Sequence, residues 1–454
     1  MKTESNNKSK LSLFYASSLT TRLTIVYFGV SVGLALQIGA ANWDIIWHGI
    51  TDVESFFTPP HTVLYSGVAL TIGSVFIGII QYVRVGGING EKGKQLEKQP
   101  EVHEPSELTT IKKPLTKAFG GARQNSFSSS SSSSSLLTSF YCLIQALIKM
   151  PYPIKLVTIG TIIEIFSGGF DSWWHYNFGF DGLLSPPHLM LTIGMLTAIY
   201  GTLIGIYKLL HNNNNKSNSR STLLKISFIV AYAVAWIVSV NTIFMFSLPY
   251  SKGQYFDFNP NPFAAILIAS VAIPFVSGML FYSAAKTLGD VHFRFTFITL
   301  AFMIIHSTAT IISNGHFAIL YPLYLLNIIP ALVADIFISS KRNQYYGRER
   351  NAHFILETKR AGISNLLRNQ RTMIFCSAIV PMIFITLFFP WSVNTYKEFF
   401  GINMNTFESI TIFNQLLWPF ISPYIIPVSV LMSIMGSYIM SRILGKLLEQ
   451  DVHG

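Results

Sequence analysis

Aspartate and histidine recur in the same order and spacing at two places in this sequence, where together they could bind a metal ion. The pattern is Asp-x3-His-x12-His, with tryptophan before the first histidine and Thr/Ser-Pro-Pro before the second. Its two copies consist of Asp44, His48 and His61, and of Asp171, His175 and His188. The offset of 127 residues between the copies also relates Leu64 to Leu191 and Gly67 to Gly194. A whole structural unit is therefore duplicated.

The spacing within each copy predicts how the three side chains meet. An aspartate and a histidine four residues apart on a helix project from the same face. The two prolines suit the first turn of the next helix, where N–H groups lack a partner within the helix. Each copy can thus gather one carboxylate and two imidazoles at a helix–turn–helix corner, a common ligand set for zinc, copper or non-haem iron. The alternative is an Asp–His hydrogen bond and a histidine that caps a helix, without metal; two copies in a place where ionisable groups are costly favour metal.

The motif resembles one found in the particulate methane monooxygenase and ammonia monooxygenase family, in the third of that family's subunits. The resemblance rests on the spacing, on the tryptophan before the first histidine and on the proline-histidine ending, and it covers about twenty residues in each copy. In that family the triad ligates a metal, generally taken as copper, in the membrane part of the complex. The resemblance implies copper at both triads, oxygenase activity and partner subunits. The duplication and the number of expected spans depart from the usual pattern of the family.

The composition is that of a polytopic membrane protein. Of the 454 residues, 50% are hydrophobic and 12% are charged, and the mean hydropathy is +0.44. Ten apolar runs are each long enough to cross a bilayer core of about 30 Å as a helix. They fall at about 20–41, 62–84, 153–170, 188–210, 222–247, 262–286, 293–313, 316–339, 373–391 and 420–445. We therefore expect an all-α fold of about ten transmembrane helices in the lipid bilayer.

The basic residues predict the organisation and orientation of these spans. The expected segments are a tail at 1–19, a first repeat at 20–84, a disordered Ser-rich linker at 85–135, a second repeat at 136–211 and a six-helix region at 212–454 with a basic connector at 340–371. Lysine and arginine gather in alternate loops, which places both termini in the cytoplasm and both motifs on the external side. The net charge of +11 is thus an orientation signal and does not indicate nucleic acid. The two helix pairs are then parallel repeats, whose axis could join the triads into one dinuclear site or leave them separate.

Several polar residues within the expected spans could take part in a site. Glu164, and Gln37 at the matching position of the first copy, could support a ligand histidine. The alternative for Glu164 is a carboxyl protonated by burial beside a water-filled gap. His306, Asn241 and His316 lie level with the motifs and could complete a site, although a lone histidine in a membrane more often bonds a neighbouring helix.

The remaining reactive groups are less informative. Asp335 could relay protons or pair with Lys341 or Arg342. The two cysteines, Cys142 and Cys376, support neither a disulfide framework nor a thiolate metal site. The sequence has no phosphate-binding glycine loop, no Gly-x-Ser-x-Gly elbow and no Cys-x-x-Cys-His motif, which weighs against an ATP-driven pump, a serine hydrolase and a c-type cytochrome.

Three hypotheses follow. The first is an integral membrane protein that binds copper, or else zinc or iron, at two external sites and oxidises a small apolar or neutral substrate with O2, together with partner subunits of an oxidase or monooxygenase complex. The second is an ion-coupled transporter or metal-handling permease, in which the triads are transit or sensing sites. The third is a membrane scaffold in which the motifs are structural corners. A composition rich in Lys, Asn and Ile suggests a prokaryotic cell membrane.

Overall fold

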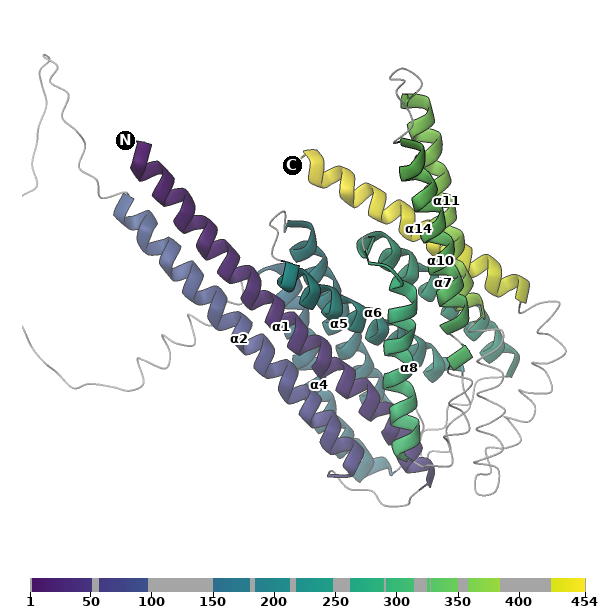
Figure 1. Ribbon diagram of the computed structural model, residues 1–454. Coiled ribbons are helices and arrows are strands. Elements are labelled where there is room, and N and C mark those ends of the chain that lie inside the picture. The colour runs from purple at the N-terminus through teal and green to yellow at the C-terminus, as the bar shows by residue number, and fades with distance from the viewer. Residues whose placement is uncertain are drawn as a thin grey trace, which may run out of the picture. The chain divides into compact units, whose positions relative to one another are not determined.

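The computed structural model is helical throughout the residues that it describes (Figure 1). These are residues 2–50, 57–96, 150–179, 184–212, 218–247, 262–289, 291–313, 325–326, 328–349, 358–383 and 426–453. Its helices are α1 (Lys2–Ile50), α2 (Pro59–Leu96), α4 (Tyr152–Phe178), α5 (Pro186–Asn212), α6 (Asn218–Ser247), α7 (Pro262–Thr287), α8 (Arg294–Ser313), α10 (Ile328–Glu349), α11 (Thr358–Ile383) and α14 (Ile426–His453).

Eight of the described helices contain a stretch long and apolar enough to cross a membrane, so the chain is a polytopic membrane protein. These stretches are Thr21–Trp47, Pro59–Gln81, Tyr152–Phe178, Pro186–Leu210, Thr222–Phe246, Leu267–Thr287, Arg294–Ser313 and Ile426–Gly445. The two other expected spans, at 316–339 and 373–391, contain the shorter apolar helices Ile328–Ser339 and Gln370–Ile383. Most of their remaining residues lie outside the described ranges.

The first two helices are longer than the sequence predicts. α1 begins at Lys2, within the expected tail, and α2 continues to Leu96, past the expected start of the linker at 85. No proline interrupts either polar extension, so the helix is not forced to end where the apolar stretch ends. Residues 97–149, which include most of the linker and Cys142, lie outside the described part. The chain divides into two compact units, Ile77–Pro151 and the rest, and every candidate site residue belongs to the second of these.

Glycines bring two helix pairs into backbone contact. A Cβ on Gly67 of α2 would lie 2.6 Å from the carbonyl oxygen of Gly33 on α1. A Cβ on Gly160 of α4 would likewise lie 2.6 Å from the carbonyl oxygen of Gly194 on α5. Such an approach is available only without a Cβ, which is the usual role of small residues at helix crossings in membranes. The two glycine pairs occupy positions that match at the offset between the motif copies.

Further along the same crossings, the glycine changes helix. Gly29 of α1 faces Ser74 of α2, whereas at the matching positions Leu156 of α4 faces Gly201 of α5. A Cβ on Gly201 would lie 2.7 Å from the Cβ of Leu156. Each crossing therefore contains one glycine, but on opposite partners.

A row of buried serines joins α14 to α7 and α11. Ser433 donates a hydrogen bond to the carbonyl of Ala378 at 2.8 Å, and Ser429 donates to the carbonyl of Ser270 at 3.4 Å. Pro274 has no N–H, so the Ser270 carbonyl four residues earlier lacks its helical partner. The Ser429 hydroxyl supplies that partner from the neighbouring helix, as is required where water is absent.

Asp335 lies at the start of a neighbouring helix. Its carboxylate accepts hydrogen bonds from the backbone N–H of Phe295 at 3.3 Å, and from the backbone N–H and hydroxyl of Thr296 at 2.8 and 2.9 Å. It therefore caps the first turn of α8, where a negative charge is stabilised by free N–H groups. The side chains of Lys341 and Arg342 lie outside the described residues. These contacts favour a structural role for Asp335 over the expected proton relay.

Candidate metal centre

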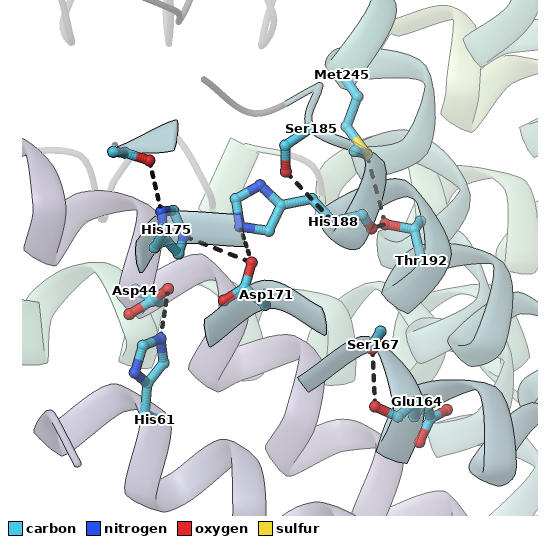
Figure 2. Close-up of polar contacts among 11 residues, drawn as sticks. Asp44, His61, Glu164, Ser167, Asp171, His175, Ser185, His188, Thr192 and Met245 are labelled. Atoms are coloured by element: carbon cyan, nitrogen blue, oxygen red, sulfur yellow. Dashed lines mark hydrogen bonds and ion pairs between the residues drawn. The ribbon is translucent and has the colours of Figure 1, made fainter. Parts of the chain in front are cut away.

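The second copy of the motif gathers its three side chains where α4 ends and α5 begins (Figure 2). The Nε2 atoms of His175 and His188 lie 3.5 and 3.4 Å from Oδ1 of Asp171. One ligand atom from each residue lies within 4.8 Å of the other two. Within the described ranges, no other three His, Cys, Asp or Glu residues meet in this way. The side chains are 21–30% exposed, so solvent or a small molecule can reach them.

The Ser/Thr-Pro-Pro-His segment determines where the third residue of each copy lies. Ser185 precedes α5, and its Oγ accepts a hydrogen bond from the backbone N–H of His188 at 3.4 Å. Thr58 does the same for the backbone N–H of His61 at the start of α2, also at 3.4 Å. The two prolines between them occupy the first helical positions, where no N–H is needed. The histidine therefore becomes the third residue of its helix, and the expected helix–turn–helix corner is present in both copies.

The ring of His175 is oriented by a backbone carbonyl. Its Nδ1 lies 3.1 Å from the carbonyl oxygen of Gly179. A carbonyl only accepts hydrogen bonds, so Nδ1 carries the proton. In the neutral ring Nε2 then presents its lone pair to the Asp171 carboxylate, an arrangement that repels unless a cation lies between them. Gly179 has a φ of 72°, a conformation that glycine adopts without strain, and so places this carbonyl just beyond the end of α4.

The geometry fits a first-row transition metal. Ligands at 2.0–2.2 Å in a tetrahedral site are about 3.3–3.5 Å apart. The two distances from Asp171 agree with this spacing. Two imidazoles and one carboxylate suit zinc, copper or non-haem iron and leave a position open. Metal-bound histidines commonly donate the other ring N–H to a carbonyl, as His175 does here.

The first copy shows two of its three residues. Nε2 of His61 lies 3.3 Å from Oδ2 of Asp44, and each side chain is 17% exposed. The side chain of His48 lies outside the described residues. The Asp–His pair of the first copy thus repeats the contact between Asp171 and His188 in the second.

The two copies contribute to one cluster (Figure 2). The carboxylate of Asp171 interacts electrostatically with His61 of the first copy as well as with its own two histidines. The hydroxyl of Tyr65 interacts electrostatically with both Asp171 and Asp44. The Tyr65 ring stacks on His61, with 5.9 Å between the ring centroids. Tyr65 therefore lies between the two carboxylates.

Of the other candidate residues, His306 and Asn241 belong to a separate network. Nδ2 of Asn42 lies 3.1 Å from Nδ1 of His306, and Asn241 donates to Oδ1 of Asn42 at 2.7 Å. These contacts join α1, α6 and α8 two residues before Asp44. His306 thus has the interhelical hydrogen bond that the sequence suggested as the alternative to a ligand role. His316 lies outside the described residues.

Glu164 and Gln37 are buried and lie next to each other. Neither carboxylate oxygen of Glu164 has a hydrogen-bond partner in the described structure, so Glu164 does not support a ligand histidine through a direct hydrogen bond. The expectation that Glu164 orients a ligand finds no contact here.

Sequence reasoning missed three contributors to the site. Tyr65 follows His61 by four residues, so helical spacing could have placed the two side chains together. The Gly179 carbonyl carries no signal in its residue type beyond the position of a glycine after a helix. Met245 of α6, whose sulfur lies 3.4 Å from the Thr192 hydroxyl one turn after His188, is brought there by tertiary packing alone.

No known protein family, curated protein or solved structure matches this chain.

Proposed function

We propose that this chain is an integral membrane metalloprotein and that Asp171, His175 and His188 bind a copper ion. The observation that carries the proposal is the ring orientation of His175, whose Nδ1 bonds the Gly179 carbonyl while Nε2 faces Asp171. A cation between the carboxylate and the two imidazoles converts a repulsive arrangement into a coordinated one. Met245 supplies a thioether near the triad, and soft sulfur in a site's surroundings favours copper over magnesium or calcium.

We propose that the first triad, Asp44, His48 and His61, binds a second ion beside the first. The contact between Asp44 and His61 has the same length range as those of the second triad, and Asp171 interacts with His61 across the repeats. The matching glycine crossings of the two helix pairs support a parallel repeat whose copies meet at this cluster. Binding at one triad should therefore change the affinity of the other.

The reaction class that we propose is oxidation of a small apolar or neutral molecule on the external side of a prokaryotic cell membrane. Copper would supply a position at which O2 and substrate react, and partner subunits would supply electrons. Partial exposure of the triad and its resemblance to the monooxygenase motif support this assignment. Tyr65 and the two aspartates would hold and position the polar end of a bound molecule.

A metal-handling permease is the second candidate. It is favoured by the buried pair of Glu164 and Gln37, which lies deeper in the helices and makes no hydrogen bond to the triad. A transporter needs such polar groups along its path, whereas an oxidation site at the surface does not. Metal uptake by reconstituted vesicles distinguishes the two, because an oxidase would bind the ion without moving it.

Metal content tests the proposal directly. Purified full-length protein is loaded with copper, zinc or iron, washed, and analysed by elemental mass spectrometry. His188→Ala should remove about one ion per chain, as should His61→Ala, because each loses one of three ligands. His292→Ala, an exposed histidine between α7 and α8, is the matched control and should keep the full content. Equal metal content in the wild type and in the double variant His61→Ala/His188→Ala would refute metal binding at the motifs.

A further inference from the structure

A second polar pair lies deeper along the same helices than the triad. Glu164 precedes Asp171 by seven residues on α4, which is about 10 Å along the helix axis and returns to nearly the same face. Its side chain is 2% exposed, and that of Gln37 on α1 is 0% exposed. Figure 2 shows Glu164 on α4, with Ser167 between it and Asp171 along the helix.

The fold makes room for these two side chains in the same way. A Cβ on Gly67 would lie 2.8 Å from Cγ of Gln37, and a Cβ on Gly194 would lie 2.8 Å from Cγ of Glu164. Each side chain thus passes over a glycine of the following helix. Gln37 and Glu164 occupy matching positions of the two motif copies, and they face each other where α1 and α4 approach.

The hydrogen bonds of Gln37 fix the orientation of its amide. Thr71 donates its only hydroxyl proton to the carbonyl of Gly67 at 3.0 Å, so its oxygen must accept from Gln37. Nε2 of Gln37 lies 3.1 Å from this oxygen, which leaves Oε1 and the second N–H of the amide for another partner. Oε1 of Gln37 and both carboxylate oxygens of Glu164 are buried without a hydrogen bond in the described structure.

An ionised Glu164 cannot satisfy this arrangement. A carboxylate only accepts hydrogen bonds, and so does Oε1 of Gln37, so at least one of the three atoms stays unpaired. The elements packed against Glu164 present Gln37 from α1 and Gly194 from α5, and no charged side chain of the described residues acts on it. A buried charge without a counter-charge is strongly unfavourable in a membrane interior.

One proton resolves all three unpaired atoms. A protonated carboxyl has one O–H donor and one carbonyl acceptor, and the free edge of the Gln37 amide has the complementary acceptor and donor. The two groups can then form a pair of reciprocal hydrogen bonds. We propose that Glu164 and Gln37 form a proton-binding site in the interior of the helix bundle, in which Glu164 carries the proton and Gln37 holds it.

This site needs no metal and is distinct from the triads. Because Glu164 lies on the face of α4 that carries Asp171, a proton released there is two helical turns from the ligands. Separation of α1 from α4 would break the acid–amide pair and expose the carboxyl to ionisation. The site therefore links the packing of the two helix pairs to the uptake or release of one proton.

Infrared spectroscopy of the metal-free, full-length protein tests this inference. At neutral pH the wild type should show a carboxylic acid C=O stretching band that is missing from Glu164→Gln, an isosteric variant that cannot carry the proton. Gln37→Leu should keep the band but shift it to higher wavenumber, because the hydrogen bond to the amide is lost. Asp335→Asn, which changes a buried carboxylate elsewhere, is the control and should leave the Glu164 band in place.

Two outcomes would overturn the proposal. Identical wild-type and Glu164→Gln spectra in the carboxylic acid region would show that Glu164 is ionised. A band that disappears when sodium is added would show that the pair binds a metal cation in place of a proton. If Glu164→Gln does not fold, the shift in Gln37→Leu still tests the pair, and an unshifted band there would also reject it. None of these results depends on copper binding, so the metal proposal stands or falls separately.

Discussion

The glycine crossing of α4 and α5 should determine both the stability of the second helix pair and its affinity for metal. In Gly160→Ala the new Cβ would lie 2.6 Å from the carbonyl oxygen of Gly194 and 2.6 Å from the backbone nitrogen of Ala198. Ordinary contact begins at 3.4 Å, so the helices must separate by about 0.8 Å, the difference between the two distances. Overpacking of this kind costs about 1–3 kcal/mol. Metal sites tolerate ligand displacements of only about 0.2 Å, so affinity should fall at least about tenfold.

Gly168→Ala on the same helix is the matched control, because nothing lies within 4 Å of its added Cβ. This variant should be neutral or slightly stabilising, since alanine favours a helix over glycine by about 0.5–1 kcal/mol. Unfolding in detergent and competitive metal titration measure the two effects on all three proteins. If Gly160→Ala unfolds at the same point as Gly168→Ala and binds metal equally well, the close contact between α4 and α5 does not hold the site.

Two further substitutions test single contacts. Gly179→Ala places a Cβ at a φ of 72°, so the carbonyl that orients His175 should move and metal affinity should drop by about 10–100-fold in competitive titration. Gly179→Asn, whose side chain tolerates this conformation, should lose much less, and an equal loss in both would exclude the backbone explanation. Asp335→Ala leaves the first N–H groups of α8 without their acceptor and should lower stability by about 1–3 kcal/mol in the same unfolding assay. Asp335→Asn keeps one acceptor oxygen and should fall between Asp335→Ala and the wild type.

Local sequence rules predicted the corner that holds the second triad. The four-residue spacing of Asp171 and His175 placed both on one face of α4, and the Ser-Pro-Pro segment placed His188 in the first turn of α5. Both depend only on helical geometry and on the chemistry of proline and serine at a helix start. The apolar runs likewise predicted eight of the membrane-crossing stretches, because length and hydropathy decide them.

Contacts between distant segments could not be predicted in this way. The meeting of His61 with Asp171 depends on how the helix pairs pack, and one sequence gives no distance between them. Asp335 was expected to relay protons or pair with nearby basic residues, but the N-terminus of a helix forty residues earlier is its partner. Glu164 was assigned to a ligand histidine, whereas tertiary packing brings it to Gln37.

The exchange of glycine between Gly29 of α1 and Gly201 of α5 has a consequence for how duplicated membrane segments diverge. Each crossing is constrained by the summed volume of two facing residues, and either partner can supply the small one. After a duplication, compensating substitutions can therefore accumulate in pairs while the interhelical distance stays constant. Residue identity between the copies then falls faster than their structural similarity. Comparing facing pairs by combined size, in place of single positions by type, should reveal ancient repeats that ordinary sequence comparison misses.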